Sequence, residues 1–254
     1  MIIPNLSERL RAGATLRLGW CNMADPLAAE VMLREGFDAV LFDMQHGALD
    51  FAQTMAGVAA AAALQAPALA RIPVGDFALA ARLLDFGAAA IVAPMINSAE
   101  DARRFVSFTK YPPLGERSWG AARAMAYAGR EGVNFLHGAN SVQLAIAMIE
   151  TRAALDALDS ILATDGVDGV LVGPMDLSIA LTQGATVDAQ HPEVEKALDH
   201  IAARARAHGK FASAFCPNGA RAKQLAARGY QLVSVGADLS LLRAGARAEL
   251  QASR

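Results

Sequence analysis

The chain has 254 residues, a length typical of one domain with a single large hydrophobic core. Its composition, 54% hydrophobic and 19% charged, excludes an intrinsically disordered protein. The 23 basic and 25 acidic residues give a net charge of −2 and form no basic block. We therefore expect no nucleic-acid or membrane partner, and a small molecule is the natural ligand.

No targeting or membrane segment is evident in the sequence. The first residues lack the basic segment, apolar run and cleavage site of a signal peptide, and no run of about 18 apolar residues follows. Cys21 and Cys216 are too few and too far apart to suggest a disulfide framework. These features predict one cytoplasmic domain over residues 1–254.

Eight apolar segments are predicted to be strands. In chain order they cover residues 15–20, 36–43, 68–72, 87–94, 143–150, 166–173, 210–216 and 229–236. Four of them begin at a glycine that ends the preceding helix and reach a potentially functional position seven residues later. Nearly continuous apolar runs are typical of parallel strands that are covered by helices.

Helix-start signals occur between these strands. Suitable N-terminal capping residues are Asp25, which Pro26 follows, then Asp50, Ser98 and Thr151. A strand and a helix that alternate eight times predict a closed (β/α)8 barrel, a TIM barrel of the α/β class.

Residues 110–140 interrupt this alternation. The sequences KYPPLGERSWG and HGAN carry turn and loop signals, so we expect a long irregular segment. Structureless stretches of this length are usually functional, which makes the segment a candidate lid over the active site or a candidate subunit contact.

Functional residues of such barrels lie at the carboxyl ends of the strands and in the loops that follow them. Glu150 ends the fifth strand, and Asp176 follows the sixth in the turn GPMD. Two carboxylates with open positions for water and substrate suit Mg²⁺, Mn²⁺ or Co²⁺. Two structural alternatives stay open: Glu150 could face solvent or cap a helix, and Asp176 could cap the helix after it.

Two further candidates point to the same end of the barrel. His46 follows the second strand, and Asp43, three residues earlier, could orient its ring. Arg71 ends the third strand, where a guanidinium needs an anionic or carbonyl partner. A structural histidine is the alternative for His46, and an ion pair to Asp43 or Asp85 is the alternative for Arg71.

The lysines argue against a Schiff-base mechanism, because none lies at the carboxyl end of a predicted strand. They are Lys110, Lys196, Lys210 and Lys223.

Long blocks of the sequence resemble the HpcH/HpaI aldolases. They are GWCNMADPLAAEVMLREGFDAVLFDMQHG, RIPVGDFALAARLLDFGAAAIVAPMINSAEDA, YPPLGERSWG and IETRAALDALDSILATDGVDGVLVGPMDLS, in the family's order. The resemblance implies a (β/α)8 barrel, a homohexamer with exchanged terminal helices, and a divalent metal ion. It also implies reversible aldol cleavage of a 4-hydroxy-2-oxo acid into pyruvate, or a close 2-oxo acid, and an aldehyde.

The resemblance also assigns catalytic roles to individual residues. It makes Glu150 and Asp176 the metal ligands, His46 the base, Arg71 the electrophilic stabiliser, Asp43 a partner of His46, and Asp85 a second support for His46 across a subunit boundary.

In the substrate site, the resemblance places the backbone amide of Met175 on the substrate carboxylate, beside Gly173 and Pro174. Met148 departs from the pattern, because the better-known members have Gln two residues before the metal-binding Glu. A polar contact to the substrate is lost there, which leaves the full substrate open.

Two other functions remain as alternatives. A related metal-dependent lyase could act on an acyl-CoA or a dicarboxylate and would want a basic cluster, for which Arg117 and Arg123 are the candidates. A non-catalytic sensor of 2-oxo acids would keep the two carboxylates but would need neither His46 nor Arg71.

Overall fold

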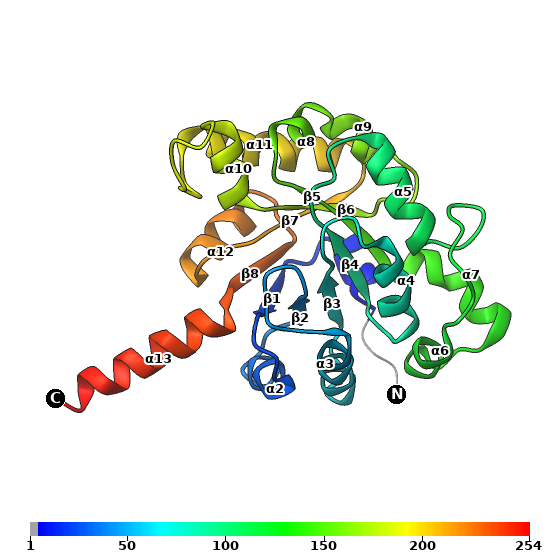
Figure 1. The fold of residues 1–254 in the computed structure, drawn as a ribbon, viewed down its shortest axis with the longest axis horizontal. Helices are drawn as coiled ribbons and strands as arrows, with labels where there is room; N and C mark the ends of the chain where they lie inside the picture. Colours follow the sequence, from blue (N-terminus) through cyan, green and yellow to red (C-terminus); the bar gives the residue numbers. More distant parts are fainter. Residues whose placement is uncertain (1–4) are drawn as a thin grey trace.

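A computed structural model describes residues 5–254, and within them the chain forms one closed barrel of eight parallel strands in sequential order (Figure 1). The strands are β1 Leu16–Cys21, β2 Ala39–Asp43, β3 Ala68–Arg71, β4 Ala90–Ala93, β5 Leu144–Ile149, β6 Gly169–Val172, β7 Phe211–Ala214 and β8 Leu232–Ala237. The predicted (β/α)8 barrel is confirmed.

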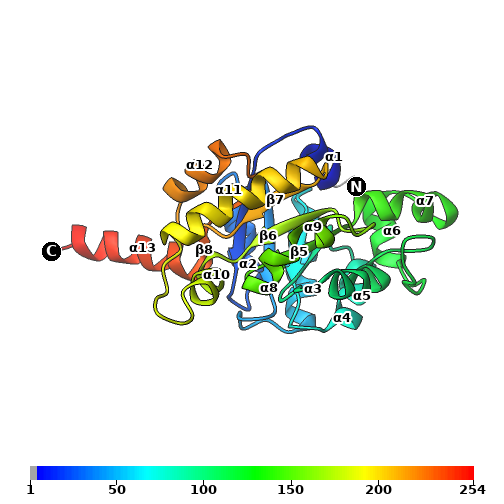
Figure 2. The same ribbon diagram turned by 90° about the horizontal axis from the view of Figure 1, so that it is seen from above.

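The described chain has thirteen helices, most of which surround the barrel on the outside (Figures 1 and 2). They are α1 Leu6–Arg11, α2 Pro26–Arg34, α3 Phe51–Ala63, α4 Phe77–Asp85, α5 Ala99–Thr109, α6 Ala122–Ala128, α7 Gly132–Val142, α8 Arg152–Asp156, α9 Leu158–Leu162, α10 Pro174–Leu181, α11 Pro192–Ala207, α12 Gly219–Ala227 and α13 Asp238–Ala252. The predicted caps are confirmed, because Asp25, Asp50, Ser98 and Thr151 each accept a hydrogen bond from a backbone N–H of the helix that follows.

The strands separate two hydrophobic clusters. Leu18, Leu41, Leu69, Ile146 and Leu171 belong to the cluster inside the barrel. The second cluster fills the layer between the strands and the helices. Because side chains alternate between these two layers and both are dry, the strands carry nearly continuous apolar runs.

The strand register places the candidate residues in two neighbouring groups at the mouth, by which we mean the end of the barrel where the strands terminate. Asp43 on β2 lies opposite Arg71 on β3. Ile149 on β5 lies opposite Val172 on β6, so Glu150 and Gly173 leave the sheet side by side.

The prediction of an irregular segment at 110–140 was wrong over its second half, where the chain forms α6 and α7. These helices bury Ala124, Phe135 and Ala139 in a small cluster with Tyr111 and Ala121. The turn signals of the sequence mark the ends of two short helices, and tertiary packing overrides them between those ends.

The same segment lies at the amino-terminal end of the barrel, because it joins the end of α5 to the start of β5. Its Arg117 contacts Gln143, just before β5, and Asp85, at the end of α4. The segment therefore cannot cover the mouth of its own barrel. A subunit contact remains its predicted role.

The last helix, α13, projects from the barrel in both views (Figures 1 and 2). Asp238 anchors its start by accepting hydrogen bonds from the backbone N–H groups of Asn22 and Met23, both 2.8 Å long. Asp238 is also the one residue of this helix that is buried. Among the described residues, no helix is long and apolar enough to cross a membrane.

Candidate active site

A buried ion pair between Arg71 and Asp43 occupies the β2–β3 side of the mouth. Arg71 Nε donates to Asp43 Oδ1 at 2.8 Å, and Nη2 donates to Oδ2 at 2.5 Å. Only 1% of Asp43 and 7% of Arg71 is exposed. Burial raises the pKa of Asp43, but the hydrogen bonds and the charge of Arg71 outweigh it, so the pKa lies below its ordinary value.

Trp20, near the end of β1, completes this pair. Its Nε1 donates to Asp43 Oδ2 at 3.2 Å, and its ring lies under the guanidinium of Arg71, 5.0 Å from ring centroid to Cζ. Nη1 of Arg71 is left for another partner, and its nearest described one is the sulfur of Met148 at 3.9 Å.

The tight turn after β2 presents His46 at the mouth. Asp43 Oδ1 accepts from the backbone N–H groups of Gln45 and His46, at 3.1 and 3.2 Å. Gly47 is required there, since a Cβ would lie 2.3 Å from the backbone oxygen of Asp43. The His46 side chain is exposed, and its ring makes no hydrogen bond to any described residue.

The predicted contact between Asp43 and the His46 ring is therefore not formed within this chain. Asp43 instead forms the ion pair with Arg71 that the sequence left as an alternative. Asp43 holds the backbone of the turn that carries His46, so it supports this residue through the main chain and leaves the ring free to meet another group.

Glu150 is a nearly dry carboxylate on the β5–β6 side, with 3% of its surface exposed. Its Oε1 accepts from the backbone N–H of Met95 at 2.8 Å, and no described residue donates to Oε2. Burial raises the pKa of Glu150, the hydrogen bond from Met95 lowers it, and the charge of Asp176 raises it further. The solvent-facing interpretation of Glu150 was wrong.

Asp176 lies in the first turn of α10, and it does not cap that helix. The residue at the N-cap position is Gly173, and no side chain makes a capping hydrogen bond there. The capping interpretation was wrong, and the exposed carboxylate is left available for a ligand. A Cβ at Gly173 would lie 2.7 Å from Glu150 Oε2, so glycine is what lets α10 start against Glu150.

The start of α10 also offers backbone donors. Pro174 has no N–H, and the first N–H groups of a helix have no partner inside it, which leaves those of Met175 and Asp176 available. These N–H groups point out of the N-terminal end of α10, where the helix dipole stabilises an anion.

Asp85 lies away from the other predicted residues. It ends α4 at the amino-terminal end of the barrel, where its Oδ1 accepts from Arg117 Nη2 at 2.6 Å. It cannot reach His46 of the same chain. A contact with His46 across a subunit boundary stays a prediction.

Several residues of the mouth escaped sequence reasoning. Met95 adopts a left-handed conformation at φ 56° and donates to Glu150, and no sequence signal marks it. Asn22 Oδ1 and Gln45 Oε1 are buried acceptors without a partner among the described residues. Asn22 directly follows β1 and Gln45 is two residues past the end of β2, so the strand-end rule could have found them.

The carboxylate pair fits a divalent cation. Among residues 5–254 no group of three or more His, Cys, Asp and Glu side chains could hold a metal. Hard cations such as Mg²⁺ and Mn²⁺ are commonly held by one or two carboxylates, with water and substrate oxygens as further ligands. Glu150, whose Oε2 lacks a donor, and Asp176 match this pattern.

A family model described as HpcH/HpaI aldolase/citrate lyase matches residues 17–244, a span that contains every one of these side chains. The chain belongs to the HpcH/HpaI aldolase/citrate lyase family. It is therefore an enzyme, a carbon–carbon lyase.

Relatives of known function cover almost the whole chain. A hydroxypyruvate/pyruvate aldolase of Rhizorhabdus wittichii is 39% identical over 229 residues, 90% of each protein. A 4-hydroxy-2-oxo-heptane-1,7-dioate aldolase of Salmonella heidelberg is 36% identical over 241 residues, 95% of this chain and 91% of that protein.

The fold agrees with solved members of the HpcH/HpaI family. A family protein from Burkholderia cenocepacia superposes with a TM-score of 0.88 at 33% identity over 98% of each chain. A citrate lyase beta subunit of M. tuberculosis, solved with oxaloacetate and magnesium, shares the fold at 21% identity and a TM-score of 0.57.

Proposed function

We propose that the protein is a metal-dependent pyruvate aldolase that cleaves a 4-hydroxy-2-oxo acid reversibly into pyruvate, or a close 2-oxo acid, and an aldehyde. The observation that carries the proposal is the buried Glu150, whose Oε2 accepts no hydrogen bond from a described residue. It lies beside Asp176, whose carboxylate does not cap α10. The names of the two relatives above support the same chemistry.

Glu150 and Asp176 would hold the metal ion. Mg²⁺, Mn²⁺ and Co²⁺ all suit oxygen ligands with open positions. A bound divalent cation supplies positive charge where a carbonyl oxygen becomes negative. Without a cation, a carboxylate as dry as Glu150 carries a desolvation cost, which is the physical meaning of its raised pKa.

The chain's own residues bind and orient the substrate. The backbone N–H groups of Met175 and Asp176, at the start of α10, donate hydrogen bonds to the substrate carboxylate. Gly173 and Pro174 shape the same turn, and Met148 lines the site next to Arg71.

Two residues act in the cleavage step, one by accepting a proton and the other by stabilising negative charge. His46 takes the proton of the 4-hydroxyl group as the bond between C3 and C4 breaks, for which an exposed ring without a partner is suited. Arg71 stabilises the negative charge that arrives on the ketone oxygen. Because Asp43 and Trp20 fix its guanidinium beforehand, little reorganisation is needed at the moment of reaction.

The structure offers little support for the acyl-CoA alternative. Arg117 is 4% exposed and bound to Asp85 and Gln143 at the amino-terminal end of the barrel. Arg123 lies on α6, where its Nε donates to Tyr127. Neither arginine belongs to the mouth, so these two residues cannot form the basic cluster that a CoA lyase would need there.

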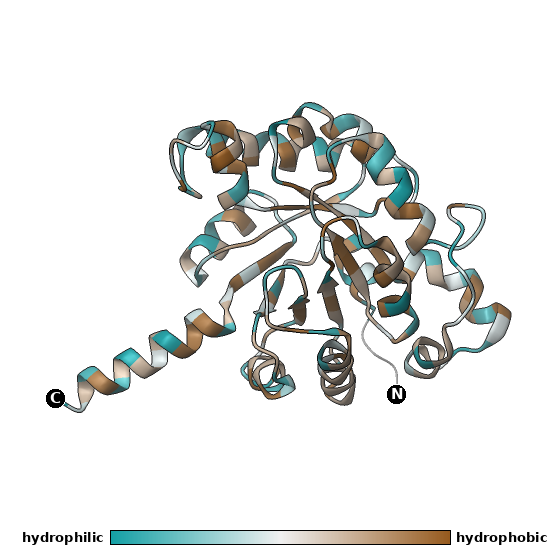
Figure 3. Cartoon of the chain, viewed as in Figure 1, coloured by the Kyte–Doolittle hydropathy of each residue, from teal (hydrophilic) through white to brown (hydrophobic). Residues whose placement is uncertain are grey.

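We also propose that the protein assembles through α13, as the resemblance to the family implies for a hexamer. The helix projects from the barrel and exposes four leucines, Leu239, Leu241, Leu242 and Leu250. Figure 3 shows the apolar segments along this helix, which nothing in the described chain covers. Projecting apolar surface of this kind is typical of an interface.

Proton exchange tests the proposed function without knowledge of the aldehyde. Metal-stripped and metal-restored protein is incubated with pyruvate in heavy water, and the loss of methyl protons is followed by NMR. We expect exchange only with the metal. Arg71→Ala should lower the rate by roughly two to three decades, while Arg103→Ala, on the surface of α5, leaves it unchanged. An absence of metal-dependent exchange in the wild type would overturn the proposal.

A further inference from the structure

A second cavity opens at the amino-terminal end of the barrel, opposite the mouth. Its volume is about 680 Å³, and it lies between α1 and α11 beneath the starts of β5 to β8. Leu10, Leu144 and Phe211 give it an apolar floor. The accessible lining as a whole is more polar than apolar, so a charged or polar small molecule fits it better than an apolar one.

Three cations line this cavity, namely Arg11, Arg206 and Lys210. Among the described residues none of them has a carboxylate partner. Arg11 Nη2 donates to the backbone oxygen of Ser141 at 3.0 Å, and Lys210 Nζ donates to that of Val167 at 2.6 Å.

Arg206 is the freest of the three. It makes no hydrogen bond to a described residue, although its guanidinium lies directly against Gly229, where a Cβ would come within 2.5 Å of Nη2. Most of its donors are therefore available to a ligand.

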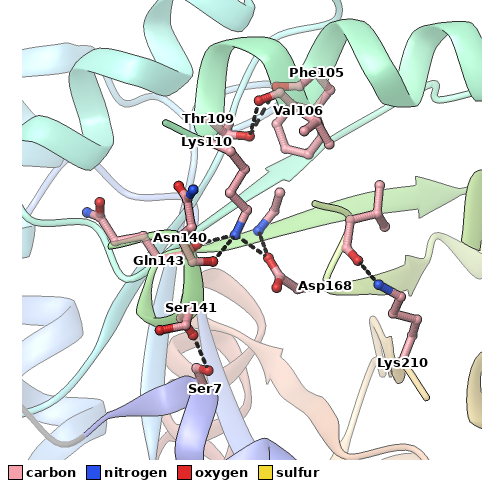
Figure 4. Close-up of polar contacts among 12 residues, drawn as sticks. Ser7, Phe105, Val106, Thr109, Lys110, Asn140, Ser141, Gln143, Asp168 and Lys210 are labelled. Atoms are coloured by element: carbon pink, nitrogen blue, oxygen red, sulfur yellow. Dashed lines mark hydrogen bonds and ion pairs between the residues drawn. The ribbon is translucent and has the colours of Figure 1, made fainter. Parts of the chain in front are cut away.

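The carboxylate in the cavity wall does not neutralise these charges. Asp168 Oδ2 accepts from Lys110 Nζ at 2.6 Å and from the backbone N–H of Ala145 at 2.8 Å (Figure 4). Lys110 is fully buried, and its other donors go to the backbone oxygens of Asn140 and Gln143.

The pKa of Lys110 shows how crowded with positive charge this region is. Burial lowers that pKa, the charge of Asp168 raises it, and the like charges of Arg11 and Lys210 lower it further. Arg11, Arg206 and Lys210 thus share the cavity wall with one carboxylate, Asp168, and that carboxylate is already paired with Lys110.

We propose that this cavity binds a small organic dianion that carries carboxylate or phosphate groups. The guanidinium groups of Arg11 and Arg206 match the planar geometry of both kinds of anion, and Lys210 adds a point charge. The apolar floor accepts a short carbon skeleton. Since the cavity is at the opposite end of the barrel from Glu150 and Asp176, this site is separate from the catalytic one.

A bound dianion also stabilises a structural junction. Lys110 joins the two ends of the 110–143 segment, and α1 is tied to the same place because Ser7 Oγ donates to the backbone oxygen of Ser141 at 2.5 Å. Neutralising the surplus positive charge removes the repulsion that acts on Lys110. The ligand therefore raises the melting temperature.

Titration calorimetry on the metal-free 254-residue chain tests the proposal, with inorganic phosphate and succinate as separate probes. Arg206→Gln and the double variant Arg11→Gln/Arg206→Gln remove the guanidinium groups from the cavity. Arg34→Gln/Arg103→Gln is the matched control, because both arginines are exposed, lie on α2 and α5, and do not line the cavity. Melting temperature is recorded for each protein with and without the probe.

We expect one saturable site for at least one probe, and a roughly 10- to 100-fold loss of affinity in the double variant, as when charged hydrogen bonds are removed. The control should bind like the wild type. Binding of phosphate alone identifies a phosphorylated ligand, and binding of succinate alone identifies a dicarboxylate. No saturable binding of either probe overturns the proposal, and so does an unchanged affinity in both cavity variants, which assigns the binding to the mouth.

Discussion

Asp43 on β2 and Arg71 on β3 lie opposite each other and are joined by two buried hydrogen bonds. This pair uses the carboxylate that was expected to orient His46. The ion pair holds the guanidinium of Arg71 in one orientation at the mouth, and the Trp20 ring packs against the face of that guanidinium. A rigid guanidinium is what stabilisation of developing charge requires.

Asp43→Asn should remove the negative charge of this ion pair and leave the side-chain volume nearly unchanged. Breaking a buried ion pair from one side leaves an uncompensated charge and costs about 3 to 5 kcal/mol. We expect the melting temperature to fall by roughly 6 to 20 °C, at 2 to 4 °C per kcal/mol for a chain of this size. Turnover should fall as well, since Arg71 loses its fixed orientation. Scanning calorimetry and steady-state kinetics measure the two effects. Asp50→Asn is the control, because it changes an exposed cap.

The same pair predicts how stability responds to acid. The folded-state pKa of Asp43 lies below its ordinary value, so the stabilisation by the ion pair is present above the unfolded pKa and is lost as pH falls through the folded pKa. In urea titrations of the wild type, part of the unfolding free energy should disappear below about pH 4. Asp43→Asn should lack that part. Equal acid sensitivity of both proteins contradicts the assignment.

The barrel and most of the mouth could be predicted from sequence, and the exceptions have physical causes. Apolar runs that end at Asp43, Arg71 and Glu150 locate the strand ends because parallel strands in a covered barrel are buried on both sides. Which of two nearby groups Asp43 contacts depends on a register of neighbouring strands, and local patterns do not encode it. The left-handed Met95 has no signal at all, since nothing in its neighbours demands that conformation.

Glu150→Gln should abolish stabilisation by the metal ion without lowering the melting temperature of the metal-free protein. Because burial raises the pKa of Glu150, its charged form is disfavoured in the folded protein at neutral pH. The metal-free variant should therefore melt at or above the temperature of the metal-free wild type. Mn²⁺ at about 100 times its dissociation constant should add about 2.7 kcal/mol to the wild type and nothing to the variant. Thermal shift assays measure both quantities. A variant that Mn²⁺ still stabilises fully contradicts the role of Glu150 as a ligand.

Gly173→Ala tests the close approach between α10 and β5. The new Cβ would lie 2.7 Å from Glu150 Oε2 and 3.0 Å from Met148 Cε, so the Glu150 side chain must move. Displacement of a ligand's support typically lowers metal affinity by roughly 10- to 100-fold, which isothermal titration with Mn²⁺ detects. Gly219→Ala is a matched control. Gly219 also starts a helix after a strand, and its Cβ would meet nothing closer than 3.6 Å. Equal affinity of the two variants would show that Glu150 does not depend on Gly173.

Leu239 and Leu242 test the proposed assembly through α13. They lie three positions apart on one face of the helix, and both are exposed in the single chain. Burial of a leucine side chain contributes about 1.5 to 3 kcal/mol, so Leu239→Glu/Leu242→Glu should weaken association by at least about two decades. Light scattering coupled to size exclusion should show an oligomer for the wild type and a smaller species for the variant. Gln251→Glu, which adds a negative charge on the opposite face of the helix, is the control and should keep the wild-type mass. The same variant tests the predicted contact between Asp85 and His46 of a neighbouring subunit. If that contact supports catalysis, the smaller species should lose aldolase activity. It should keep its affinity for Mn²⁺, because Glu150 and Asp176 belong to one chain.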